Sequence, residues 1–156
     1  MSHKGIRLLI EDTAKSLADN ITFDYGRRSD TNMKRDIKYP LIACSLLSST
    51  ASYADNNVFN YSKTWQVSIV FIEPDSDGSS QEQYSLILDR MADLVDRFIN
   101  KLNFNAQSDC VESGDIIITG ISTQPFIKAM KDVVTGHILN FSIQEIDNFN
   151  YCSIVC

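Results

Sequence analysis

The alternation of apolar and polar residues predicts a long β-strand over residues 61–72. Its apolar side chains recur at every second position, a pattern that indicates a strand with one face on a core. The apolar positions are Trp65, Val67, Ile69 and Phe71, with Gln66 and Ser68 between them. Val70 and Ile72 interrupt the alternation at the end of the strand.

An amphipathic helix is predicted directly after an acidic turn at residues 73–80. Ser80 and Gln83 have the spacing of a capping box at its start. Ser79 and Glu82 have the same spacing. The apolar stripe consists of Tyr84, Ile87, Leu88, Met91, Leu94, Val95, Phe98 and Leu102. A helix of about 22 residues is ~33 Å long and a strand of about 12 residues is ~40 Å long. The helix can therefore cover most of the strand.

A second, N-terminal helix is predicted from Gly5 to Asp19, because apolar residues again recur at helical spacing. They are Ile6, Leu9, Ile10, Thr13, Ala14, Leu17 and Ile21. Residues 20–25 lose this period, so no regular element is predicted there, and Gly26 permits a turn.

Another strand is predicted before the long strand at 61–72, joined to it by a loop. Residues 39–47 are mostly apolar after Tyr39 and Pro40, and the segment 48–60 is polar. We interpret 39–47 as a strand and 48–60 as a loop that leads into 61–72. An antiparallel hairpin is the expected pairing.

The C-terminal third of the chain predicts two more strands. The first runs from Asp115 to Ser122; Pro125 and the apolar run after it fit either a bent continuation or a short helical turn. The second runs from Val133 to Ile146. Its inward residues are Leu139, Phe141 and Ile143, and its outward residues are Asn140, Ser142 and Gln144. The tail at 147–156 is a possible fifth, edge strand.

These elements predict one α+β domain over residues 1–156. We expect an antiparallel four- to five-stranded sheet with one long helix packed on one face, preceded by an N-terminal helix. Residues 26–38 are interpreted as an extended basic arm or long loop, and 147–156 as a C-terminal tail.

Composition narrows the function classes. The chain has 156 residues and a formal net charge of −6, which argues against a sequence-independent DNA-binding protein with a broad basic face. No apolar run approaches the roughly 20 residues of a membrane span. The four cysteines are expected to be reduced thiols in a cytosolic compartment.

The sequence offers few catalytic groups. His3, in a terminus expected to be mobile, and His137 have no assigned carboxylate or thiol partner, and nucleophilic catalysis requires a base within reach of the nucleophile. The cysteines lack the close pairs of a structural zinc site, and Cys44 is expected to be buried. We therefore expect no enzymatic activity, metal or cofactor. A nucleophile at Cys110 or Cys152 is the remaining enzymatic alternative.

The basic arm is the one segment with unusual charge. It is either a solvated loop or a contact for an acidic surface, for which the turn at 73–82 of a neighbouring copy is the candidate. That turn lacks the glutamate that closes an EF-hand loop, so we interpret it as a solvated acidic turn. The candidate interface residues are Arg27, Arg28, Lys34 and Arg35 in the arm, Glu73, Asp75 and Asp77 in the turn, and Tyr151 in the tail.

The order of these parts resembles a known family. An N-terminal helix leads to Phe23–Asn32 (FDYGRRSDTN), then Tyr39–Ile42 (YPLI), a long strand ending at Glu73–Asp75 (EPD), one long helix, and a strand pair carrying Asp132–Gly136 (DVVTG), with a cysteine near the C-terminus. This resembles the tail terminator or tail completion proteins of tailed bacteriophages, particularly those of phages of Bacteroides-like hosts, including crAss-like phages.

The resemblance implies a non-enzymatic virion protein that forms a homo-oligomeric ring at the head–tail junction, assembled in the host cytoplasm. Its partners would be copies of itself and adjoining portal, connector or tail proteins. DNA would pass through the ring without specific binding, and no membrane would be involved. The alternative is a cytosolic α+β dimer that binds a small ligand or peptide along a free sheet edge.

Overall fold

The computed structural model describes most of the chain and confirms the α+β class. The described residues are 2–18, 20–26, 38–53, 60–75, 80–108, 115–129 and 134–148. In chain order the elements are α1 (His3–Lys15), β1 (Thr22–Tyr25), β2 (Leu41–Cys44), β3 (Ser48–Tyr53), β4 (Asn60–Pro74), α3 (Gln81–Ser108), β5 (Asp115–Ala129) and β6 (Val134–Asn148).

The sheet has six strands in the described part of the chain, in the order β1-β2-β4-β6-β5, with β3 also paired to β4. All pairs are antiparallel except β1 and β2, which run parallel. The expected hairpin pairing of β2 with β4 is confirmed. The expectation of four to five antiparallel strands was wrong in two places, because residues 22–25 form β1 and residues 48–53, expected as loop, form β3.

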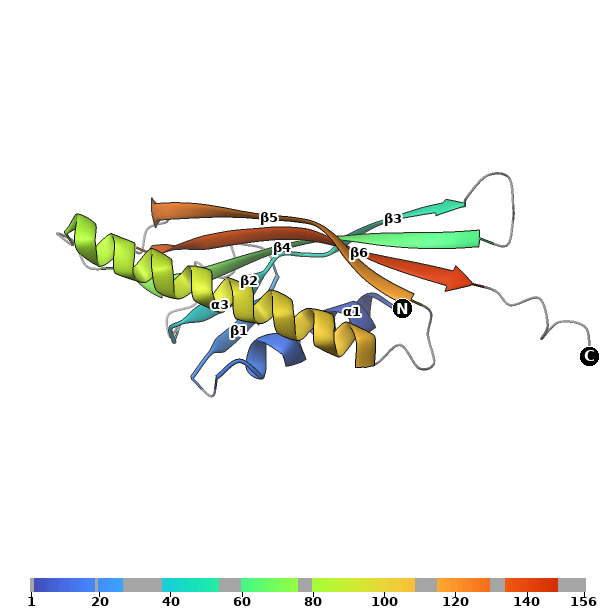
Figure 1. Ribbon diagram of the computed structural model, residues 1–156, viewed down its shortest axis with the longest axis horizontal. Helices are drawn as coiled ribbons and strands as arrows, with labels where there is room; N and C mark the ends of the chain where they lie inside the picture. The colour runs from blue at the N-terminus through green and yellow to red at the C-terminus, as the bar shows by residue number, and fades with distance from the viewer. Residues whose placement is uncertain are drawn as a thin grey trace, which may run out of the picture.

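Three strands of 15 residues give the sheet its length. β4 and β6 pair without a break from Asn60 and Asn148 to Pro74 and Val134, and at strand rise such a ladder is ~50 Å long. The 28 residues of α3 span ~42 Å at helical rise. In Figure 1, α3 runs along the sheet, and the ends of β3, β4 and β6 at the right extend past its C-terminal end.

The main core lies between the two helices and one face of the sheet. Phe71 of β4 and Phe98 of α3 are fully buried and meet edge to face, with ring centroids 5.6 Å apart. The core is completed chiefly by Trp65, Val67 and Ile69 of β4, Leu139, Phe141 and Ile143 of β6, Met91, Leu94, Val95 and Leu102 of α3, and Ile6, Leu9 and Ile10 of α1. The sequence-predicted inward residues of the two central strands are therefore confirmed.

A second, smaller apolar cluster explains why the alternation fails at the end of β4. Val70 and Ile72 are buried on the opposite face of the sheet. They pack with Leu41, Ala43 and Val134. This end of β4 is buried on both faces, so its sequence is continuously apolar.

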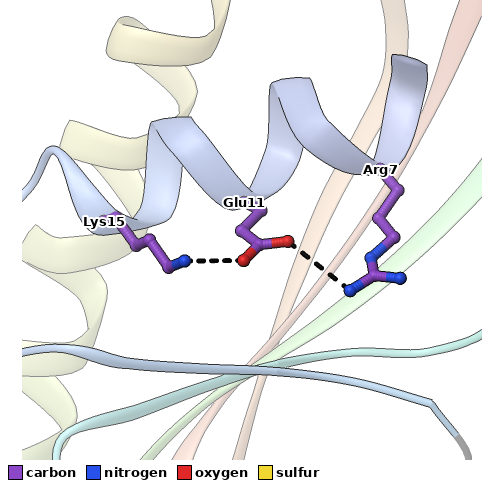
Figure 2. Close-up of polar contacts among 3 residues, drawn as sticks. All are labelled: Arg7, Glu11 and Lys15. Carbon is purple, nitrogen blue, oxygen red and sulfur yellow. Dashed lines mark hydrogen bonds and ion pairs between the residues drawn. The ribbon is translucent and has the colours of Figure 1, made fainter. Parts of the chain in front are cut away.

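The N-terminal helix has a capped start and carries ion pairs along its exposed side. The Ser2 hydroxyl accepts a hydrogen bond from the Gly5 amide at 3.2 Å, and α1 ends at Lys15, earlier than expected. The Glu11 carboxylate lies between two basic side chains (Figure 2). Its Oε1 is 2.6 Å from Lys15 Nζ, and its Oε2 is 3.7 Å from Arg7 Nη2. Exposed pairs of this kind contribute little stability, so the buried apolar face is what holds α1 in place.

The outer strand β5 is continuous but bent. Its register against β6 shifts between Thr119 and Ser122, where Gly120 has a φ of +63°, a conformation that favours glycine. Strand pairing then resumes and continues through Pro125 and Phe126. Of the two readings of this segment, the bent strand is confirmed.

Candidate assembly surfaces

The sheet face turned away from the helices is polar and uncharged over much of its area. Side chains alternate between faces along a strand, so the strand register determines which residues share this surface. We call it the polar face. It consists of Ser48, Thr50 and Ser52 of β3, Ser62, Thr64, Gln66 and Ser68 of β4, Asn140, Ser142 and Gln144 of β6, and Ile117, Thr119, Ser122 and Gln124 of β5.

Hydroxyl and amide groups on the polar face bond to one another across strands. The hydroxyls of Ser52 and Ser62 are 2.9 Å apart, and the Ser142 hydroxyl donates to Gln66 Oε1 at 3.0 Å. None of these residues is charged, whereas a well-designed soluble surface carries charge at about 25–35% of its positions. Asp115, at the start of β5, is not among them, although its register partner Ile146 is opposite Ser62 of this face.

The charged cross-strand pair of the two central strands at this end of the sheet lies on the other face. Lys63 and Glu145 are cross-strand partners, and alternation places both on the helix side. The Lys63 ammonium lies 4.2 Å from the Trp65 ring centroid, and Glu145 is buried. Around the Lys63–Glu145 pair, β4 and β6 therefore place their charged residues on the helix side and uncharged polar residues on the polar face.

Two of the sequence-predicted interface residues can be placed. Glu73 binds Arg90 of α3 through both carboxylate oxygens, at 3.0 and 3.2 Å. Asp75 accepts a hydrogen bond from the buried Thr135 hydroxyl at 3.1 Å. Both carboxylates are thus engaged within the chain, and their contact with a neighbouring arm stays a prediction.

The other predicted interface residues lie outside the described part of the chain. They are Arg27, Arg28, Lys34, Arg35, Asp77 and Tyr151. The same holds for the possible edge strand in the tail at 147–156 beyond residue 148.

An open cleft of about 630 Å³ lies beside the Glu73–Arg90 pair, between α3 and the chain that joins α1 to β1. Arg97, on its wall, donates to the Leu17 carbonyl at 2.8 Å and lies 4.0 Å from Asp93. Both arginines of the cleft are therefore engaged within the chain. Their position supports a role in fastening α3 to the rest of the domain.

His3 helps to dock α1 on the sheet, so its assignment to a mobile terminus was wrong. The Tyr25 hydroxyl accepts a hydrogen bond from the Leu47 amide at 3.2 Å and lies 3.0 Å from His3 Nε2. The His3 ring also meets the Trp65 ring edge to face at 5.8 Å. These contacts give His3 a structural role that joins α1, β1 and β4.

His137 lies on β6 and contacts α3. Burial lowers the pKa of its imidazole, and a hydrogen bond with the Leu88 backbone and the Asp96 carboxylate oppose that shift. No cysteine thiol is its cross-strand partner, because it pairs with Phe71 and Pro125. The geometry supports the structural interpretation of this histidine.

Cys44 is buried in the main core, as expected, with 2% of its surface exposed. Its thiol donates to the Ser45 carbonyl at 3.4 Å. Burial raises the pKa of this thiol to about 12. Because the thiolate is the reactive form, Cys44 is suited to packing and poorly suited to nucleophilic chemistry.

The Cys44 thiol should make stability fall as the pH rises above about 9. Between the unfolded pKa near 9 and the folded pKa near 12, the folded state binds more protons, so ionisation favours unfolding. Its contribution is complete below pH 9, and each further pH unit removes up to ~1.4 kcal/mol. Urea unfolding at pH 8, 9 and 10 should show a steeper decline for the native chain than for Cys44→Ala. Parallel declines would contradict the assignment.

Neither metal ligation nor membrane insertion is indicated by the described residues. Within the described ranges, no three His, Cys, Asp or Glu side chains gather as a metal site would require. The helices of these ranges include none with both the length and the apolarity to cross a bilayer.

No known family model matches the chain, and no curated protein matches its sequence.

The polar face was only partly visible in the sequence. The outward positions Gln66 and Ser68 of β4, and Asn140, Ser142 and Gln144 of β6, were recognised from alternation. The β3 residues were missed because a short run of serine, threonine and alanine resembles a loop. An available signal was the alternation of Ser62 and Thr64 with Lys63 and Trp65, which extends the polar side of β4 toward its start.

Proposed function

We propose that this chain is a structural protein of a tailed-phage virion that forms a ring of copies around the DNA passage at the head–tail junction. The polar face is the observation that carries this proposal. Proteins bind DNA nonspecifically by neutralising phosphates with lysine and arginine. A wide surface without cations lets DNA slide past without being held.

The proposal assigns the polar face to the passage and α3 to the outside of the ring. The fold supports this arrangement because the helices pack on the opposite face of the sheet. It is also compatible with the net charge of −6, which disfavours retention of a polyanion.

Electron microscopy and mass photometry of the purified full chain test the assembly. We expect particles of one size with a central opening. A twofold dimer without an opening would instead support the alternative, a dimeric binding module. A monomer at all salt and protein concentrations would contradict the proposed ring.

Lysines placed on the polar face should make the ring retain DNA. In the variant T64K/N140K the charge of each chain rises by two, and the new ammonium groups would face the passage. We expect binding of linear duplex DNA that weakens by at least tenfold between about 50 and 200 mM salt. Covalently closed circular DNA should not bind, because it cannot thread through a ring.

Asp93→Lys is the matched control, since it also raises the charge of each chain by two. Asp93 is exposed on α3, the helix assigned to the outside. Fluorescence anisotropy should therefore show little retention of linear DNA by this variant. Stronger retention by Asp93→Lys than by T64K/N140K would indicate that α3 faces the passage, which would contradict the assignment of the polar face.

A further inference from the structure

The outer edge of β5 is open with respect to every other strand in the described part of the chain. Among the described strands, β5 pairs only with β6, so the backbone groups on its other side have no strand partner there. Open edges of this kind are templates for another strand, and natural proteins commonly protect them with charges, prolines or bulges.

After Asp115, the first part of β5 lacks these protections. The bulge at Gly120 and the proline at Pro125 interrupt the later part of the strand, whereas residues 115–119 pair regularly with β6. Between residues 116 and 119 no side chain is charged, and Ile117 is 42% exposed. This segment is therefore the part of the edge best suited to accept a further strand.

The opposite edge at the same end of the sheet has the same character. β3 pairs with β4 and with no other described strand, and its residues 48–53 carry no charge. One row of cross-strand partners joins the two edges, from Ile117 through Gln144 and Thr64 to Thr50. The sheet thus presents two uncharged edges at one level.

Strand direction makes these two edges complementary between copies. Three successive antiparallel pairings separate β5 from β3, so the two strands run in opposite directions. A second copy in the same orientation, placed beside the first, would bring its β3 antiparallel to β5. We infer that consecutive copies of this chain join by pairing residues 116–119 of β5 with β3 of the next copy.

This pairing uses both edges and keeps the polar faces of all copies on one side. It is a heterologous contact, which closes into a ring when each step adds a rotation. Pairing of β5 with β5 about a twofold axis would leave β3 open in the resulting dimer, so the geometry favours β5 with β3. The inference rests on the proposed ring for its number of copies, while the edge contact has its own test.

Cysteine cross-linking distinguishes the two pairings. On a background with Cys110, Cys152 and Cys156 replaced by serine, Thr50→Cys and Ile117→Cys are made singly and together and treated with a short bis-maleimide. We expect the double variant to give a ladder of dimer, trimer and larger species on a denaturing gel. Each single variant should give only the small background of the parent chain, whose remaining Cys44 is buried.

Substitution of two isoleucines on β5 tests how much each position contributes to assembly. Ile117→Lys and Ile127→Lys place the same charge at exposed positions on β5, but Ile127 lies beyond the bulge and the proline. We expect Ile117→Lys to raise the concentration for half-assembly by at least tenfold and Ile127→Lys to change it by less than threefold. Far-UV circular dichroism should show that both variants remain folded.

Each outcome bears on one claim. Dimers from Ile117→Cys alone would overturn the pairing in favour of a twofold β5 contact. A ring by electron microscopy without a ladder, or equal effects of the two lysines, would overturn the edge contact and leave the ring. A chain that stays monomeric would overturn both.

Discussion

Gly136→Ala should unfold the protein or lower its free energy of unfolding by at least ~3 kcal/mol. A Cβ at this position would lie 1.8 Å from the Phe71 carbonyl oxygen and 2.9 Å from its carbonyl carbon. Both atoms belong to the backbone of β4, which is held between β2 and β6 at this level. The clash therefore cannot be relieved by a rotamer change, and a backbone shift in a packed sheet costs more than the usual ~1–3 kcal/mol of overpacking.

Gly120→Ala is the control for Gly136→Ala. Gly120 has a φ of +63°, but its added Cβ would meet only the Ser142 hydroxyl at 3.9 Å. We expect a cost of about 1–2 kcal/mol from the left-handed conformation alone. Urea unfolding followed by circular dichroism should place the midpoint of Gly136→Ala far below that of Gly120→Ala. Equal midpoints would contradict the close approach of β6 to β4.

The elements with strong periodicity could be predicted because their burial follows local geometry. β4, β6 and α3 each bury one face along most of their length, so alternation or a helical stripe marks them. α3 extends to Ser108, beyond the predicted end, because Ala106 is buried and Asn105 donates to Thr13 of α1 at 3.0 Å. That contact joins residues 92 positions apart and leaves no periodic signal.

The missed strands depend on partners rather than on their own sequence. β1 has four half-buried residues and exists as a parallel partner of β2. β3 consists of serine, threonine and one alanine over residues 48–52 and is defined by its pairing with β4. A short strand without a continuous apolar face cannot be distinguished from a loop by alternation, so the predicted sheet was narrower than the observed one.

The candidate surfaces show the same limit. Alternation could say that Gln66 and Ser142 face away from the core, but only the register of β4 against β6 places them opposite each other. The acidic turn was expected to be free for a neighbouring copy, whereas Glu73 binds Arg90 of the following helix. Charge in a sequence indicates what a surface can bind, and the fold decides which charges are already engaged.

Phe98→Ala should lower the free energy of unfolding by about 3–5 kcal/mol, as expected for a buried phenylalanine replaced by alanine. Phe98 is fully buried, and its edge-to-face contact with Phe71 joins α3 to the centre of the sheet. The residual cavity would lie between two long, regular elements that cannot easily collapse into it. Thermal unfolding should show a fall in Tm of roughly 10 °C for a domain of this size.

Phe104→Ala provides the comparison within the same helix. Phe104 is 64% exposed, and the Lys101 ammonium lies 5.2 Å from the centroid of its ring. Removal of the ring should therefore change the free energy of unfolding by no more than ~0.5 kcal/mol. The two substitutions delete the same atoms from α3, and their difference isolates burial against the sheet. If Phe104→Ala proved as costly as Phe98→Ala, α3 would have to bury a different side of the helix against the sheet than the one described.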